Sequence, residues 1–202
     1  PHIPQSLARA WKLSELPAPT LRRALILSIG HGPDAPVLAA RVTADAGAPL
    51  SASALAGLAA LSSPELGGRL GPGDSFVLEA RKTDARTACR ALLSEGRDLP
   101  GFEAGSHPDG DPRARALIAT AKLPEPLADI VRVGEGLTGR GPSFPLALCL
   151  ATRSLDLPRD AAFALMAVGR CVGWLGHAME QAGSGSPFQA RLRYVASGSA
   201  TI

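Results

Sequence analysis

Four side chains with polar atoms recur along the most apolar stretch of this 202-residue chain. Between residues 161 and 183 nearly every residue is apolar or small, and the exceptions include Arg170, Trp174, His177 and Gln181. At about 100° per residue, these four fall on a single stripe of a helix. A guanidinium keeps its proton inside proteins, so a buried arginine needs an anion. The stripe therefore predicts an anion near Arg170, either a bound ligand or a carboxylate of a neighbouring helix.

The residues around this stretch indicate where such a helix starts and stops. Pro158 and Asp160 are typical of a helix start, and Gly183 is typical of a helix end. A helix this apolar is expected to be buried on all sides. Its length also fits a membrane span, but Arg170 at its centre would cost several kcal/mol in lipid. We therefore predict a core helix and no membrane association.

Helix signals recur along the rest of the chain, so the predicted fold class is all-α. Asp34 and Asp111 each stand where a side-chain oxygen can cap a helix, and proline follows each of them closely. The sequence predicts helices at 6–13, 20–28, 35–46, 51–63, 112–122, 124–135, 144–155 and 159–182, and two short exposed helices between 75 and 95. Breaks rich in Gly and Pro are expected at 64–73 and 100–110, and a short strand is allowed at 191–195.

Composition excludes several classes of function. The net charge is +3 and the pI about 9.1, but the arginines are scattered and no basic run is interleaved with aromatic residues, so we expect no nucleic-acid partner. The three cysteines, Cys89, Cys149 and Cys171, lack the spacing of a metal or redox motif. We therefore expect no metal site and a reduced, cytoplasmic setting.

Several motifs resemble, in the same order, those of the citrate synthase family. Residues 169–174 (GRCVGW), with His177, resemble the signature near the family's C-terminus. The other segments that resemble family motifs are 101–102 with 108–114 (GFGHPLYPDGDPRA in the family), 58–68 (ALSGPLHGGA), 31–41 (HELNASTFAAR) and the tail at 191–194. The resemblance extends over most of the chain, which corresponds to the C-terminal half of a typical member.

The resemblance implies a chemistry for which this chain lacks the reactive groups. The family joins the methyl carbon of acetyl-CoA to the ketone of oxaloacetate, with two histidines and an aspartate handling protons. At the matching positions this chain has Leu66, Ala104 and Pro145, none of which can exchange a proton. Gln189 replaces an arginine that, in the family, reaches into the partner subunit's site. The resemblance thus leaves no catalytic residue.

Three positions that hold the ligand's carboxylates in the family are retained: His31, Arg113 and Arg170. Guanidinium groups bind carboxylates through paired hydrogen bonds. The hypothesis that follows is a catalytically inactive homologue, a pseudoenzyme. It either binds a dicarboxylate such as oxaloacetate, or an acyl-CoA-type ligand, without a cofactor, or serves as partner subunit of an active homologue.

An alternative is an acyltransferase whose catalytic groups have moved. His107 lies three residues beyond the position of one lost histidine, and Glu65 stands beside Leu66. A general base must lie within hydrogen-bond reach of the proton it removes, and sequence does not show this. The neighbourhood of the two arginines separates the hypotheses, since carboxylate partners from this chain would favour a structural role for them.

The resemblance also predicts two domains and an oligomer. Residues 1–73 and 166–202 would form a reduced large domain, and residues 74–165 a small domain on the acyl-CoA side. In the family, large-domain helices pack against a second subunit. Here the small-residue helix at 51–62 carries Leu55, Leu58 and Leu61, which we expect to form an apolar patch. We therefore expect a homodimer, or a heterodimer with another citrate-synthase-like chain.

Overall fold

The structure is a computed structural model that describes residues 2–13, 18–30, 32–103, 107 and 109–188. Within these ranges the chain forms helices and no strand, which confirms the all-α class. The helices are α1 (Ile3–Ala10), α2 (Ala18–Ser28), α3 (Ala35–Asp45), α4 (Leu50–Leu61), the 3-10 turn η1 (Gly67–Arg69), α5 (Leu70–Lys82), α6 (Ala85–Ser94), α7 (Pro112–Ala121), α8 (Glu125–Thr138), α9 (Phe144–Ser154) and α10 (Ala161–Gly183). The strand considered at 191–195 lies outside the described residues.

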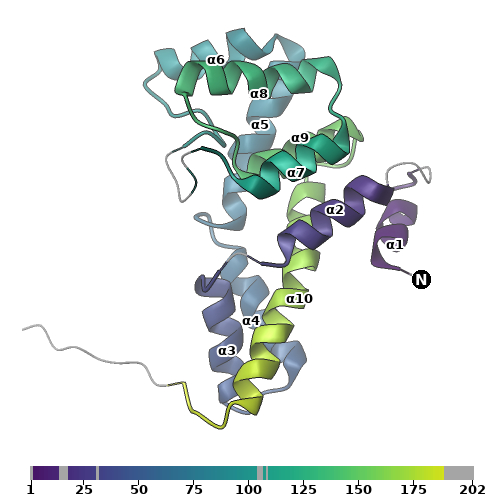
Figure 1. Ribbon diagram of the computed structural model, residues 1–202, viewed down its shortest axis with the longest axis vertical. Helices are drawn as coiled ribbons and strands as arrows, with labels where there is room; N and C mark the ends of the chain where they lie inside the picture. Colours follow the sequence, from purple (N-terminus) through teal and green to yellow (C-terminus); the bar gives the residue numbers. More distant parts are fainter. Residues whose placement is uncertain (1, 14–17, 31, 104–106, 108, 189–202) are drawn as a thin grey trace, which may run out of the picture.

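The helices gather in two groups (Figure 1). In the lower group of that view, α3, α4 and α10 pack against one another, and α10 also contacts α2. The upper group contains α5 to α9, in which α9 packs on α5 and α7, and α8 packs on α5 and α6. The packing of α10 on α9 and of α2 on α7 joins the groups.

Both aspartates that the sequence predicts as caps do cap their helices. The Asp34 carboxylate accepts a hydrogen bond from the Val37 amide at 3.2 Å, and the Asp111 carboxylate accepts one from the Arg113 amide at 2.9 Å. Helices α3 and α7 each end within one residue of the expected position. The break expected at 64–73 is shorter, because η1 and the first turn of α5 occupy its second half.

The expectation that α10 is buried on all sides is wrong for its C-terminal half. Arg170 and Trp174 are buried, but Val172 is 54% and Met179 61% exposed. By length and composition α10 is the one helix among the described residues that could cross a membrane. It is also packed on α2, α3, α4 and α9, and a core helix of a folded protein passes the same test.

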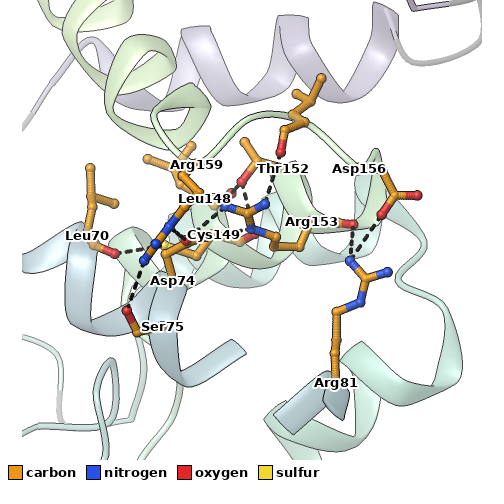
Figure 2. A network of polar contacts seen from close by, with 11 residues as sticks. Leu70, Asp74, Ser75, Arg81, Leu148, Cys149, Thr152, Arg153, Asp156 and Arg159 are labelled. Carbon is orange, nitrogen blue, oxygen red and sulfur yellow. Dashed lines mark hydrogen bonds and ion pairs between the residues drawn. The ribbon is translucent and has the colours of Figure 1, made fainter. Parts of the chain in front are cut away.

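Helix α5 corrects a second expectation, because it is not an exposed helix. One face of it is buried, including the carboxylate of Asp74. Figure 2 shows this carboxylate facing the guanidinium of Arg153 on α9. Arg153 Nε lies 2.6 Å and Nη2 2.8 Å from the two carboxylate oxygens, and Nη1 donates to the Leu157 carbonyl at 3.0 Å. This ion pair ties α5 to the start of the segment that leads into α10.

Candidate functional site

The glycines around Arg170 let another helix approach α10. A Cβ added to Gly169 would lie 2.6 Å from the Leu25 carbonyl oxygen, and one added to Gly173 would lie 2.2 Å from the Ile29 carbonyl oxygen. Only glycine fits such contacts with a neighbouring backbone. On another side of α10, Trp174 lies where a side chain on Gly57 of α4 would be. The GRCVGW motif therefore places Arg170 between the end of α2 and the α3–α4 pair.

Arg170 is 1% exposed and its anion is Asp34. Both Asp34 oxygens lie 2.6 Å from the same guanidinium nitrogen, Nη2. The Nε atom is buried and has no hydrogen-bond partner among the described residues. The guanidinium carbon lies 5.6 Å from the centre of the Trp174 ring, a cation–π distance. The sequence allows either a bound ligand or a carboxylate of a neighbouring helix as the anion at Arg170. In the structure a carboxylate of this chain contacts it.

Arg113, at the start of α7, is also paired with a carboxylate of this chain, that of Asp111. Its Nε donates to both Asp111 oxygens at 3.0 and 3.1 Å, and its Nη2 donates to Asp111 Oδ2 at 2.6 Å. The guanidinium also stacks 5.0 Å from the centre of the Phe144 ring. Burial raises the pKa of the Asp111 carboxyl, but the hydrogen bonds and charge of Arg113 outweigh this and leave that pKa below its ordinary value of 3.8. The pair is therefore ionised at neutral pH.

The two arginines reach the same connection, the one between α2 and α3, from different groups of helices. Arg113 Nη1 donates to the Gly30 carbonyl at 2.7 Å, while Arg170 holds Asp34 four residues further along. His31, the third retained position, lies outside the described residues. The structure thus brings Arg113 and Arg170 to the two ends of one short segment.

The rest of the stripe on α10 is a seam with α3. The amide of Gln181 accepts from Arg41 at 2.8 Å and donates to Asp45 at 3.0 Å. His177 is half-exposed, and its Nδ1 lies 3.5 Å from Glu180 of the same helix. Asp34 at the start of α3 pairs with Arg170, and Asp45 at the end of α3 pairs with Gln181. Helices α3 and α10 therefore lie side by side and run in the same direction. Three members of the stripe therefore join helices, and His177 does not.

The positions that carry protons in the family are apolar here. Leu66 is partly buried against the core just before η1, and Pro145 is the second residue of α9. Ala104 lies outside the described residues. The displaced candidates are solvent-facing: Glu65 forms an exposed ion pair with Arg69, and His107 is exposed. His107 is nevertheless close to the Arg113 pair along the chain, because its carbonyl accepts a hydrogen bond from the Gly110 amide at 2.9 Å, one residue before Asp111.

Nucleophilic and metal chemistry have little support among the described residues. Burial raises the pKa of all three cysteine thiols, that of Cys149 to about 12. A thiol with a raised pKa is a poor nucleophile, because the thiolate is the reactive form. In the same part of the chain no group of three His, Cys, Asp or Glu side chains is placed to hold a metal ion.

Two hollows lie near these elements, and neither is lined by Arg113 or Arg170. A groove of about 830 Å³ runs between α1, α2 and α10, with Ile3, Ile26 and Val172 in its lining. A hollow of about 450 Å³ lies beside the turn that contains Gly67 and Gly68. Among the described residues, both arginines are held by carboxylates of this chain.

Sequence reasoning missed three acidic residues of these ion pairs. Asp34 and Asp111 were identified as caps only, although the same carboxylates also hold arginines. The family segment HELNASTFAAR has asparagine at the position of Asp34, which is a signal that a charge is added here. For Asp74 and its partner Arg153 the sequence carries no comparable signal, because the two residues are 79 positions apart.

The arrangement of helices is similar to that of solved structures of citryl-CoA lyase and citrate synthase. Citryl-CoA lyase from Hydrogenobacter thermophilus aligns with a TM-score of 0.83 and 21% identity, over 97% of this chain and 84% of that chain. Citrate synthase from the archaeon Thermoplasma acidophilum aligns with a TM-score of 0.74 and 23% identity, over 94% of this chain and 55% of that chain. At these identities the likeness defines the fold, which is that of citrate synthase.

Sequence comparison then gives the family. Residues 3–192 match the family described as citrate synthase, C-terminal domain. The proteins named "Putative citrate synthase 2" in Mycobacterium bovis and Mycobacterium tuberculosis are 30% identical over 181 residues, which is 83% of this chain and 48% of theirs. The chain belongs to the citrate synthase family, and it spans about half the length of the curated relatives that it matches.

Proposed function

We propose that this protein is a non-catalytic member of the citrate synthase family that acts as a partner subunit of a citrate-synthase-like assembly. The observation that carries the proposal is the pairing of both retained arginines with carboxylates of the same chain, Asp34 and Asp111. The apolar residues at the proton-handling positions, Leu66 and Pro145 among the described ones, add to it. Of the two roles that the sequence predicts, partner subunit is better supported than dicarboxylate or acyl-CoA binding.

Exposed apolar side chains support an assembly through the α3–α4–α10 layer. On α4, Leu55 is 66% exposed and Leu50 40%. Leu61 is buried and Leu58 packs partly against the core of this chain, so the patch differs from the one expected at 55, 58 and 61. The neighbouring helices α3 and α10 also carry exposed apolar residues: Leu38, Val42, Val172 and Met179. Apolar residues at this density on adjoining helices are typical of a surface that a partner covers.

The proposal assigns different roles to two domains of the chain. Residues 1–73 with 166–202 would be the reduced large domain that assembles, and residues 74–165 the small domain. The grouping of the helices in Figure 1 supports this division, with α5 crossing the first boundary. We also propose a cytoplasmic location, in line with three unpaired cysteines.

The test is an activity assay joined to a measurement of mass. The purified protein should release no detectable CoA from acetyl-CoA plus oxaloacetate, or from citryl-CoA. Light scattering during size exclusion should give at least a dimer rather than the 20.7 kDa monomer. Leu55→Arg should break the assembly, since an unpaired charge in an interface is strongly destabilising. The matched control is Leu93→Arg, at a 41% exposed position on α6, which should assemble normally.

A second candidate is an acyltransferase or lyase with a rearranged site, and His107 is the observation in its favour. This histidine lies four residues before Asp111, with its carbonyl bound to the Gly110 amide, on the loop that carries a catalytic histidine in the family. CoA release that is abolished by His107→Ala would establish this candidate and overturn the non-catalytic proposal. CoA release that survives His107→Ala would overturn both.

A further inference from the structure

The contact between Arg170 and Asp34 is less complete than a carboxylate and a guanidinium allow. A bidentate pair uses two guanidinium nitrogens, one for each oxygen. Here both oxygens of Asp34 lie on Nη2, and the buried Nε of Arg170 has no acceptor among the described residues. The Arg170 guanidinium therefore keeps capacity to bind a second or better-placed anion.

The Asp34 carboxylate is placed where it can move away from Arg170 into water. Its side chain is 24% exposed whereas that of Arg170 is 2% exposed, so water reaches the acid and not the base. Apart from Arg170, the Asp34 carboxylate has one described hydrogen-bond partner, the Val37 amide that it caps at 3.2 Å. Serine and asparagine cap helices about as well as aspartate does, so the cap itself does not require a charge.

The second arginine lies at the other end of the same connection. Arg113 is 28% exposed at its side chain and donates through Nη1 to the Gly30 carbonyl at 2.7 Å. Asp111 already occupies Arg113 Nε and Nη2, so an anion entering beside Asp34 would bind Arg170 directly and would have the guanidinium of Arg113 at the other end of the segment. Two cationic groups at the ends of one short segment match the two carboxylates of a small dicarboxylate.

We propose that Asp34 is an internal competitor for this anion site: its carboxylate occupies Arg170 and keeps a small dicarboxylate out. The inference rests on the proposed non-catalytic function, because a chain that processed a dicarboxylate could not hold its own carboxylate on the receiving arginine. It explains why an aspartate stands at a position where the family segment has asparagine. Removal of the Asp34 charge should convert the protein into a dicarboxylate binder.

The experiment is thermal unfolding of Asp34→Ser with malonate as the probe, against sodium chloride of equal ionic strength. Serine keeps a capping oxygen, removes the charge and leaves room beside Arg170. At malonate concentrations ten times its Kd, the melting temperature of Asp34→Ser should rise by about 3 °C or more, because a ligand of the folded state stabilises it by mass action. The wild type should rise by less than about 1 °C under the same conditions.

The matched control is Asp84→Ser, which makes the same change at another cap. Asp84 caps α6 by accepting from the Thr87 amide at 2.9 Å, and the arginine whose charge acts on its carboxylate, Arg86, is exposed, so this variant should not respond to malonate. The double variant Asp34→Ser with Arg170→Met should lose the response as well. If Asp34→Ser does not fold in chloride, its refolding yield in malonate is measured instead, and recovery in malonate alone supports the proposal.

Three results would overturn the inference: an equal response of wild type and Asp34→Ser, a response of Asp34→Ser no larger than that of Asp84→Ser, or a response that survives Arg170→Met. A variant that refolds in neither salt would overturn it too, since the ion pair would then be structural. None of these results bears on CoA release by the wild type. The failure of this inference and that of the proposed function are therefore distinguishable.

Discussion

Two buried arginines, Arg153 and Arg170, hold carboxylates in different groups of helices and in different ways. Every guanidinium nitrogen of Arg153 has an acceptor, and its partner Asp74 is 6% exposed (Figure 2). Arg170 uses one nitrogen on Asp34, which is 24% exposed. A second arginine, Arg159, also approaches Asp74 at 3.5 Å. The first pair is closed and supported by neighbours, while the second is open on the side of the acid.

The same difference extends to the helices around each pair. Three buried side-chain nitrogen or oxygen atoms lack a partner among the described residues: Ser53 Oγ, Arg170 Nε and Trp174 Nε1. All three belong to α4 or α10, and none to the helices that carry Asp74 and Arg153. Buried polar groups are nearly always hydrogen-bonded, so these exceptions show that the packed pair α4 and α10 is less completely satisfied than the helices around Arg153. The number of guanidinium nitrogens that have an acceptor therefore distinguishes a structural arginine, such as Arg153, from a candidate binding arginine, such as Arg170.

The largest expected effect is loss of the closed pair. Asp74→Ala should lower the free energy of unfolding by about 3–5 kcal/mol, because it leaves the buried charge of Arg153 without its anion. Urea unfolding followed by circular dichroism measures this change. The control is Asp156→Asn in the same network, whose side chain is 79% exposed and whose pair with Arg81 should contribute less than about 1 kcal/mol; asparagine also tolerates the positive φ at this position. Equal losses for the two variants would remove the distinction between buried and exposed pairs in this network.

The open pair should be less costly to break. Arg170→Met should lower the free energy of unfolding by about 1–2 kcal/mol, since Asp34 is left near water and can be hydrated. The comparison variant is Arg153→Met, which strands a carboxylate that is 6% exposed and should cost more. If Arg170→Met proves the more destabilising of the two, Arg170 is the structural arginine and the contrast drawn here is reversed.

A smaller test uses two buried hydroxyls, one in each region. Ser53→Ala removes an oxygen without a partner and should leave the stability unchanged or raise it by up to about 1 kcal/mol. Thr152→Val removes a hydroxyl that donates to the Leu148 carbonyl at 2.9 Å, and should cost about 1 kcal/mol. A clear loss of stability in Ser53→Ala would mean that its hydroxyl does have a partner in solution.

The sequence predicts the local parts of this architecture well and the long-range pairs poorly. The caps at Asp34 and Asp111 were predictable, because cap and helix start are adjacent in the chain. The position of Arg170 followed from helical periodicity and from the motif around it. Its pairing with Asp34 joins residues 136 apart, and nothing in either segment specifies the other. The exposure of Leu55 but not Leu61 depends in the same way on how α4 packs against α3 and α10.

The smallest effect concerns pH and the Arg113–Asp111 pair, which lies between the two extremes because Asp111 is buried and Arg113 is partly exposed. Since the pKa of Asp111 in the folded protein is below its ordinary value of 3.8, the unfolded chain binds this proton more readily. The stabilisation is therefore fully present above about pH 4 and is lost as the pH falls through the lower, folded pKa.

Asp111→Asn keeps the cap and should lose less stability than the wild type between pH 5 and pH 3, by an amount below about 1 kcal/mol. Arg113→Met should flatten the profile in the same way, because it removes the donor that lowers the pKa. Urea unfolding at a series of pH values measures this, and a wild-type slope in both variants would show that another carboxyl dominates the acid response.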